Sequence, residues 1–477
     1  MDIQTKKNNF WLEHPAISLL LFVSFILFIR LVLRGSVLLL DESEQVVLAQ
    51  NLLPGYPNQP PLYTWLQYFF FHVLGVNLFS LALLKCLLLF GCLYLFYLIS
   101  QLHCQNNVLA WCALASWALI PSIGLDLVKD NTHSILVLFA VCLTWYWFHI
   151  YNHCSEFFWY GGFGGIIGIG LLAKFNYLLF FIIFFISSLT IQAYRKRLMH
   201  PFMLVSLIMT MIITSPYAYW LLKYSDLGFA SAYKLNPSGV TYLYGLVQLF
   251  KTSLLFTAPL FVAAIFFHGS QFKQKSDLLL YRYHLLCLPI LATIVILGRF
   301  SEFETRWLIP ILFLCPVLYF SQLKYSPALK TKVISFFVLC AATQVLYFLI
   351  LIYNSHSDHT KRKQVSLQQI LEFIKADSSK RDYIVSDSYW LLGNIATTLP
   401  TKNLWLIQPT KEYLPKGRSL IVWTTPQLPY WINLFAHSSL LTEIKLLVNP
   451  ETKRVIGGQA FGYIPSKELV VFSMNNS

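Results

Sequence analysis

Two adjacent carboxylates, Asp41 and Glu42, follow the first long apolar run and are the residues of this chain best suited to chemistry. Charge at the edge of a bilayer is costly unless it is solvated or serves a function. An acid pair at a membrane surface can deprotonate an acceptor hydroxyl, or can hold a metal ion that does so. A plain end of a membrane span would not need the Gly-Tyr turn and the Pro60-Pro61 pair that follow. We therefore take both acids as candidate catalytic residues.

Further charged residues recur at the ends of apolar runs in distant parts of the chain. Lys129 and Asp130 precede the fourth run, and Lys174 lies between the fifth and the sixth. Arg306 stands just before a later run. Each has a simpler explanation, because a lysine can extend to the headgroups and loop charge is usually solvated. Together, however, such cations can neutralise a phosphate that leaves attached to a lipid, which indicates group transfer from a lipid phosphate.

The composition is that of a polytopic membrane protein. Of the 477 residues, 57% are hydrophobic and only 12% are charged, whereas soluble domains carry about 25% charged residues. The net charge of +14 would suggest nucleic acid in a soluble protein. Here the basic residues lie at the ends of apolar runs, so we expect membrane lipids and no nucleic acid as partners. The nine cysteines include no CxxC pair, which favours small buried side chains over a metal or disulfide framework.

These residues must be positioned by membrane-spanning helices, of which we expect about eleven, each of roughly 20 residues. The apolar runs lie near 16–38, 77–100, 107–123, 131–150, 157–173, 175–193, 202–222, 246–267, 283–298, 307–322 and 331–353. Loops 194–201, 268–282 and 323–332 are basic, which makes them cytoplasmic by the positive-inside rule. The segment from Asp41 to Trp65 and the chain after 353 then lie outside. Within that segment, 42–53 and 60–73 read as short helices in the interface.

Beyond residue 355 the composition changes to that of a small soluble module. We therefore expect a transmembrane catalytic domain over 1–355 and an extracytoplasmic α/β domain over 356–477. Helices are expected at 366–376, 389–398 and 427–437, and strands at 382–386, 403–408, 419–424, 441–448 and 457–464. This domain contains no cysteine and no nucleophile motif. We expect it to act as a lid or to dock the acceptor.

The order of these motifs resembles that of the GT-C class of membrane glycosyltransferases. The motifs are D-E-x6-A-x-x-L from Asp41, G-Y-x-x-x-P-P-L-Y from Gly55, G-L-L-A-K-F around Lys174 and R-W-L-I-P from Arg306. More narrowly, the chain is similar over roughly residues 30–320 to the bacterial family related to protein O-mannosyltransferases and to the aminoarabinose transferase of lipid A (glycosyltransferase family 39/83-like). The resemblance implies a GT-C-like helical membrane fold with the small α/β domain attached.

The resemblance also implies roles for individual residues. Asp41 would be the general base or a carboxylate beside a metal, with Glu42 its neighbour, and Asp130 would orient the acceptor. The lipid-linked phosphate would be bound by Lys174 and Arg306, with Lys129 as a further candidate. The wall of the substrate pocket would be formed by Tyr56, Gln59, Pro60, Pro61 and Tyr63.

One departure from the family pattern concerns the residues before the proline pair. The aminoarabinose branch has Glu-Lys there, whereas this chain has Asn58-Gln59. A metal ligand and a phosphate cation are thereby lost, so a divalent metal and the identity of the sugar both stay open. No cofactor is certain on these grounds.

The expected function is transfer of a sugar from a polyprenyl (undecaprenyl) phosphate, by inverting displacement, at the outer face of the inner membrane. The acceptor would be a hydroxyl or phosphate of lipid A, another glycolipid, a polysaccharide or a protein. The alternative is a transporter or flippase, which predicts ionisable residues at mid-bilayer and a two-fold hydropathy repeat. The charged residues instead lie near span ends, and the hydropathy shows no clear repeat.

Overall fold

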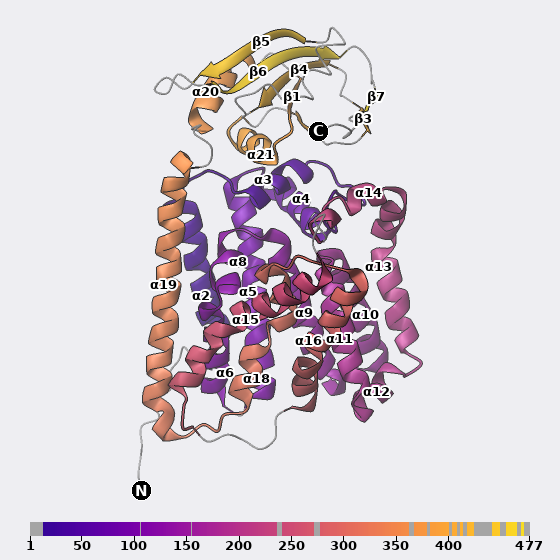
Figure 1. Cartoon of the computed structure of the whole chain (residues 1–477), viewed down its shortest axis with the longest axis vertical. Coiled ribbons are helices and arrows are strands. Elements are labelled where there is room, and N and C mark those ends of the chain that lie inside the picture. Colours follow the sequence, from indigo (N-terminus) through magenta and orange to yellow (C-terminus); the bar gives the residue numbers. More distant parts are fainter. Residues whose placement is uncertain are drawn as a thin grey trace. The chain divides into compact units, whose positions relative to one another are not determined.

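The structure is a computed structural model. It describes residues 13–104, 106–153, 155–235, 241–270, 277–361, 367–378, 382–399, 403–407, 411–413, 417–423, 441–448, 455–464 and 469–471 (Figure 1). The chain forms two compact units, which are described separately below. The first comprises Met1–Phe28, Leu53–Trp65 and Leu83–Leu349. The second comprises Ile29–Leu52, Leu66–Ala82 and Ile350–Ser477.

Within the described residues, eight helices are long and apolar enough to cross a membrane. They are α2 (Pro15–Phe28) with its continuation η1 (Ile29–Leu33), α5 (Leu78–His103), α9 (Thr132–His149), α10 (Glu156–Ala173), α13 (Met203–Lys223), α15 (Tyr242–Phe266), α16 (Leu278–Gly298) and α19 (Lys330–Lys361). Two further pairs of helices, bent by 83° and 119°, would raise the number of spans to ten if each pair counts as one. These are α6 (Asn107–Ala115) and η2 (Ser116–Leu119) with α7 (Pro121–Gly124) and α8 (Asp126–Lys129), and α11 (Asn176–Leu189) with α12 (Gln192–Leu198). The chain is a helical multi-pass membrane protein, as predicted.

The predicted span over 307–322 differs most from the structure, in addition to the two bent pairs. It consists of three short helices, η5 (Thr305–Leu308), α17 (Ile309–Leu312) and α18 (Cys315–Ser321). Pro310 and Pro316 lie at the first turns of α17 and α18, where proline lacks the N–H that would continue the preceding helix. The backbone carbonyls of this segment find side-chain donors instead. Phe313 O accepts from Trp117 at 3.2 Å, and Ile311 O accepts from Tyr283 at 2.8 Å.

In the first unit, α10 and α13 approach closely because glycine replaces larger side chains at their contact. A Cβ added to Gly164 would lie 2.2 Å from the backbone oxygen of Ser206. The Ser206 hydroxyl donates to Tyr160 O at 2.6 Å, and that of Thr210 donates to Gly164 O at 2.9 Å. Small residues and cross-helix hydroxyls are the usual means of joining helices in a membrane, where burial of apolar surface gives little driving force.

The second unit contains the C-terminal α/β domain. Its helices are α20 (Leu367–Ser378) and α21 (Tyr389–Thr398). The five-stranded sheet has the order β2 (Asn403–Leu406), β1 (Tyr383–Ser386), β4 (Gly417–Trp423), β6 (Val455–Ile464), β5 (Leu441–Val448). β1 runs parallel to both β2 and β4, whereas β6 is antiparallel to β4 and β5. A separate antiparallel pair, β3 (Lys411–Tyr413) with β7 (Leu469–Val471), was not expected from the sequence. The helix predicted near 427–437 lies outside the described residues.

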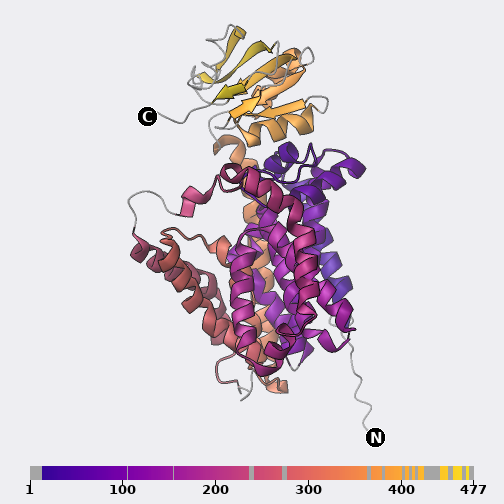
Figure 2. The same cartoon turned by 90° about the vertical axis from the view of Figure 1, so that its right-hand side faces the viewer.

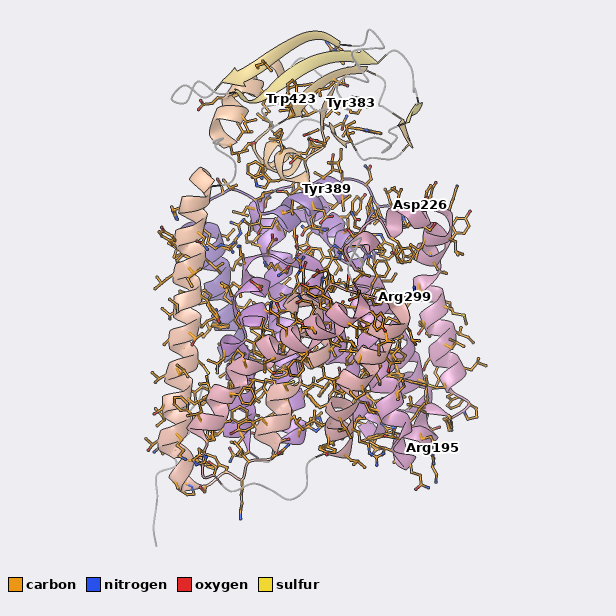
Figure 3. All side chains as sticks on the ribbon, viewed as in Figure 1. Arg195, Asp226, Arg299, Tyr383, Tyr389 and Trp423 are labelled. Atoms are coloured by element: carbon orange, nitrogen blue, oxygen red, sulfur yellow. The ribbon has the colours of Figure 1, made fainter. Side chains whose placement is uncertain are left out.

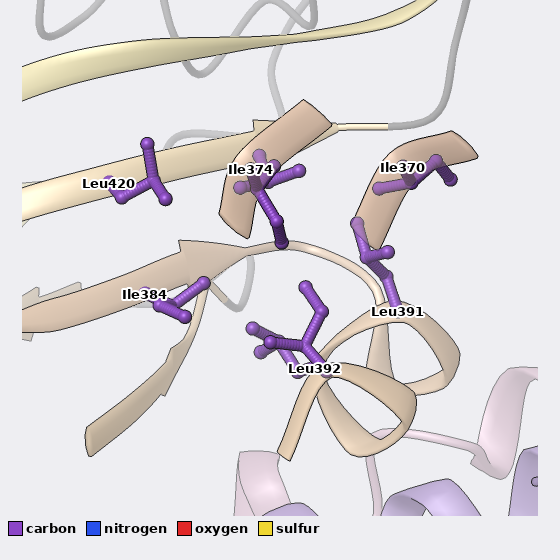
Figure 4. Close-up of a cluster of buried hydrophobic side chains, with 8 residues drawn as sticks. Ile370, Ile374, Ile384, Leu391, Leu392 and Leu420 are labelled. Carbon is purple, nitrogen blue, oxygen red and sulfur yellow. The ribbon is translucent and has the colours of Figure 1, made fainter. Parts of the chain in front are cut away.

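The core of this domain joins both helices to the sheet. It consists of buried Ile370, Ile374, Ile384, Leu391, Leu392, Ile395, Leu420 and Val422 (Figure 4). α21 also packs against α3 (Leu40–Leu48), the helix that carries the acid pair, which belongs to the same unit (Figures 1 and 2). The predicted interface helices 42–53 and 60–73 correspond to α3 and α4 (Leu62–Leu74). The domain boundary at 355/356 stays a proposal, since α19 continues through these residues.

Candidate functional site

The acid pair lies in the first turn of α3, and its two carboxylates have different surroundings. Glu42 is 3% exposed and forms a two-pronged ion pair with Arg30, at 3.0 Å from Nε to Oε1 and 2.7 Å from Nη2 to Oε2. The backbone N–H of Leu39 also donates to Glu42 Oε2 at 3.0 Å. Glu42 therefore fixes the start of α3 and its attachment to η1. Asp41 is half-buried in the same turn, where the helix dipole favours a negative charge.

The Gly-Tyr/Pro-Pro segment is packed into the first unit. A Cβ on Gly55 would lie 2.3 Å from the Trp220 ring, so only glycine fits there. Asn58 adopts a left-handed conformation with φ 68°, donates from its backbone to Leu227 O at 3.0 Å, and accepts from the Ser231 hydroxyl at 2.8 Å. Thus Asn58 binds α14 (Ser225–Gly228) and the turn after it.

The predicted pocket residues lie in or beside this anchored loop. Tyr56 and Tyr63 are 2% and 1% exposed, and the Tyr56 hydroxyl accepts from Leu53 N at 3.0 Å. Pro60 and Pro61 are buried, and Gln59 is half-buried. The segment is a rigid wall built from prolines and buried tyrosines, which suits a pocket boundary. Whether it faces a substrate stays a prediction.

Lys174 lies at the end of α10 and joins two chain segments of the first unit. Its ammonium donates to the Ser134 hydroxyl in the first turn of α9 at 2.8 Å. His133, next to Ser134, contacts Ala173 O at 3.4 Å, and its ring lies 5.5 Å from that of Tyr63. The structure therefore brings together Lys174, the start of α9 and the end of the pocket segment, although neither His133 nor Ser134 was among the predicted site residues.

Lys129 and Arg306 interact with a carboxylate that the prediction did not include. Asp126 interacts electrostatically with both Lys129 and Arg306. Asp130 ends α8, its backbone N–H donating to Asp126 O at 3.0 Å. Arg306 is 44% exposed and pairs with Glu304. A phosphate bound at Arg306 would have to compete with that carboxylate.

Asp41 and Glu42 belong to the second unit, whereas the predicted cations and the pocket segment belong to the first. The pairing of Asp41 with those cations therefore stays a prediction. Arg30 is the clearest residue that the sequence did not reveal. It lies inside the first apolar run (16–38), and nothing in its local sequence marks it as the partner of Glu42.

A group of metal-ligating side chains lies elsewhere in the first unit. Within the described residues, His103, His149 and Asp277 have ligand atoms within 4.8 Å of one another. Trp145 donates to His103 Nε2 at 3.0 Å, and Asp277 accepts from the backbone of Leu279 and Leu280 as the cap of α16. Burial raises the pKa of the Asp277 carboxyl, but the hydrogen bond from His103 outweighs this effect and lowers the pKa well below its usual range. These contacts account for the cluster as a structural one.

Comparison with known proteins adds independent information. The family described as dolichyl-phosphate-mannose-protein mannosyltransferase matches residues 58–220. The lipopolysaccharide core galacturonosyltransferase RgtB of Rhizobium johnstonii is 28% identical over 386 residues, which cover 76% of each chain. RgtA of the same organism, named for the same activity, is 31% identical over 323 residues, or 64% of each chain. The chain thus spans just under two thirds of the length of RgtA.

The fold also matches a solved structure. ArnT from Cupriavidus metallidurans bound to undecaprenyl phosphate superposes with a TM-score of 0.61 over 93% of this chain and 97% of that one. At 10% identity this likeness shows the fold alone. Taken with the sequence relatives and the membrane helices, it settles the class of the protein. The chain is a multi-pass membrane glycosyltransferase with the GT-C fold.

Proposed function

We propose that this enzyme transfers a sugar, a hexuronic acid in the first instance, from a polyprenyl phosphate to the lipopolysaccharide core. The observation that carries the proposal is the similarity over 76% of the chain to a galacturonosyltransferase of that core. The undecaprenyl phosphate in the structure of ArnT supports a polyprenyl phosphate as the donor. Basic loops such as Arg195–Arg197 favour transfer at the outer face of the inner membrane.

The chemistry would be a single inverting displacement. Asp41 accepts the proton of an acceptor hydroxyl, whose oxygen attacks the anomeric carbon as the bond to the lipid phosphate breaks. The phosphate leaves with the electron pair of that bond and stays on its lipid. Lys174 and Arg306 stabilise its charge, and loss of one such partner costs about 3 kcal/mol in the transition state. Glu42, held by Arg30, keeps the turn that carries Asp41 in place.

The test is mass spectrometry of the lipopolysaccharide core, lipid A and envelope proteins from a deletion strain and its parent. We expect the core of the deletion strain to lack one hexuronosyl residue, which the wild-type gene restores. If the deletion strain lacks a different sugar, that sugar rather than a hexuronic acid is the one transferred. If lipid A or a protein changes instead of the core, that molecule is the acceptor. Unchanged glycans with an altered pool of lipid-linked sugar would favour transport instead.

The Asp41→Asn variant tests the general base directly. The amide keeps the size of the side chain but cannot accept the proton, so we expect transfer to be lost while membrane insertion and unfolding temperature stay unchanged. Complementation of the deletion strain, followed by the same mass analysis, measures the outcome. Full transfer by this variant would remove Asp41 from the mechanism.

Lys174→Ala tests the phosphate role, with Lys223→Ala as its matched control. Both lysines stand at the C-terminal ends of membrane helices of the first unit, but Lys223 is exposed and contacts the Tyr224 ring. We expect Lys174→Ala to lower kcat/KM for the lipid donor by about 100-fold and Lys223→Ala to leave it unchanged. If kcat/KM for the lipid donor is the same in both variants, Lys174 does not bind the phosphate and only extends to the headgroups.

A further inference from the structure

We propose that Asn394 of the C-terminal domain is a positioning residue for helix α3, so that this domain is part of the catalytic apparatus rather than a lid. The proposal rests on the role of Asp41 in the proposed function. Both helices concerned, α21 and α3, lie within the second unit. The contact between them is polar, buried and directed at the turn that carries the acid.

The amide of Asn394 binds the main chain just before α3 on both its hydrogen-bonding sides. Leu38 N donates to Asn394 Oδ1 at 2.8 Å, and Asn394 Nδ2 lies 3.3 Å from Leu38 O. Nδ2 also lies 3.3 Å from the Ser43 hydroxyl in the first turn of α3. Asn394 is 1% exposed, and Leu38 and Ser43 are fully buried. A buried amide that bonds both backbone groups of one residue fixes the position of that residue, and its loss deprives the buried Leu38 N–H of this acceptor.

The surrounding packing brings the two helices into close contact. A Cβ on Gly393 would lie 2.5 Å from Ser43 Cα, so glycine is required for the backbones to approach. Trp390 adds a hydrogen bond from its indole to Leu38 O at 2.9 Å. One turn further along α21, Ala396 packs against a cluster that includes Leu38 and Val46.

The start of α3 is therefore held from two directions. Arg30 binds it through Glu42, and Asn394 binds it through Leu38 and Ser43. Asp41 lies between these anchored residues in the sequence. Ordinary domain docking would be served by apolar contacts alone, whereas these hydrogen bonds set the register of one turn. A displacement of a catalytic group by about 1 Å can lower the rate by about 100-fold.

The experiment compares Asn394→Ala with Thr397→Ala in the full-length enzyme. The Thr397 hydroxyl donates only within its own helix among the described contacts, to Asn394 O. We expect Asn394→Ala to lower kcat by about 10- to 100-fold with KM for the lipid donor unchanged, and Thr397→Ala to change neither. An unchanged kcat for Asn394→Ala would overturn the proposal, as would a fall in kcat matched by Thr397→Ala.

A cysteine pair keeps the proposal testable if Asn394→Ala does not fold. In Ser43→Cys/Asn394→Cys, one thiol replaces the Ser43 hydroxyl and the other stands at Asn394 Cγ, the atom bonded to the Nδ2 that lies 3.3 Å from that hydroxyl. Oxidation is expected to join the two thiols and to restore kcat, and reduction to lower it again. A disulfide that forms without restoring activity would refute the positioning role.

Hydrogen exchange separates this proposal from the proposed function. We expect the amides of Leu40–Leu48 to exchange faster in Asn394→Ala than in Thr397→Ala, whatever the substrate is. Equal exchange in the two variants would contradict the positioning role of Asn394, even if the enzyme is an active transferase. If the wild-type enzyme transfers no sugar while the two variants still differ in exchange, only the proposed function is contradicted.

Discussion

Glu42 and Arg30 form the buried ion pair that fixes the start of α3, with side chains only 4% and 7% exposed. Removing one partner of such a pair strands a charge away from water, which costs about 3–5 kcal/mol. We therefore expect Arg30→Ala to lower the unfolding temperature of the detergent-solubilised enzyme markedly. Light scattering or intrinsic fluorescence during heating measures it.

Arg418→Ala is the control for Arg30→Ala within the same unit. Arg418 pairs with Asp382, but their side chains are 56% and 45% exposed, and exposed pairs contribute at most about 1 kcal/mol. We expect only a small change in unfolding temperature. Similar shifts in the two variants would mean that the Arg30–Glu42 pair contributes no more than a surface pair.

The sequence identified the acid pair but could not divide its roles. Asp41 and Glu42 are neighbours of the same chemical type, and the residue that distinguishes them, Arg30, lies 12 positions before Glu42 inside an apolar run. The hydrogen bond between Leu38 and Asn394 spans 356 positions. A single sequence carries no local signal for such contacts, because nothing in the spacing of Asn394 marks it as more than a polar residue on a helix.

Close packing of α10 on α13 makes these two helices sensitive to a single added methyl group. A Cβ at Gly164 would meet the backbone of Ser206, which cannot rotate away, whereas nothing lies within 4 Å of a Cβ at Gly161. We expect Gly164→Ala to destabilise the enzyme by about 1–3 kcal/mol and Gly161→Ala, on the same helix, to be neutral or slightly stabilising. Thermal unfolding of the two variants in detergent checks this difference, and equal unfolding temperatures would contradict it.

The elements themselves were predictable wherever one long pattern determines them. Apolar runs located α5, α9 and α10 to within a few residues, and the helix predicted at 389–398 coincides with α21 (Tyr389–Thr398). The run at 307–322 was apolar enough to read as a span, but Pro310 and Pro316 break it into short helices whose carbonyls bond to side chains of other helices. Hydropathy measures the cost of leaving water and is insensitive to such breaks.

At the scale of the whole molecule, the positions of the charged residues on the first unit support a proposal for its orientation in the membrane. Arg195 lies on α12, before α13 begins, and Asp226 lies just after α13 ends, so that the two mark opposite ends of that helix (Figure 3). α12 also holds Lys196 and Arg197, and such basic clusters are typical of the cytoplasmic side. We therefore propose that Asp226 faces the outer side, together with the pocket segment that Asn58 joins to α14.

This orientation predicts which positions a membrane-impermeant thiol reagent can reach. In cells with a permeabilised outer membrane, we expect labelling of Asp226→Cys but not of Arg195→Cys until the inner membrane is opened. Both side chains are exposed, and the unsubstituted enzyme measures the background from its own cysteines. The reverse pattern would place the Asn58 segment and the transfer reaction on the cytoplasmic side, where a polyprenyl-linked sugar would first have to face inward. It would thereby contradict the proposed side of transfer, while leaving the assignment of the GT-C fold intact.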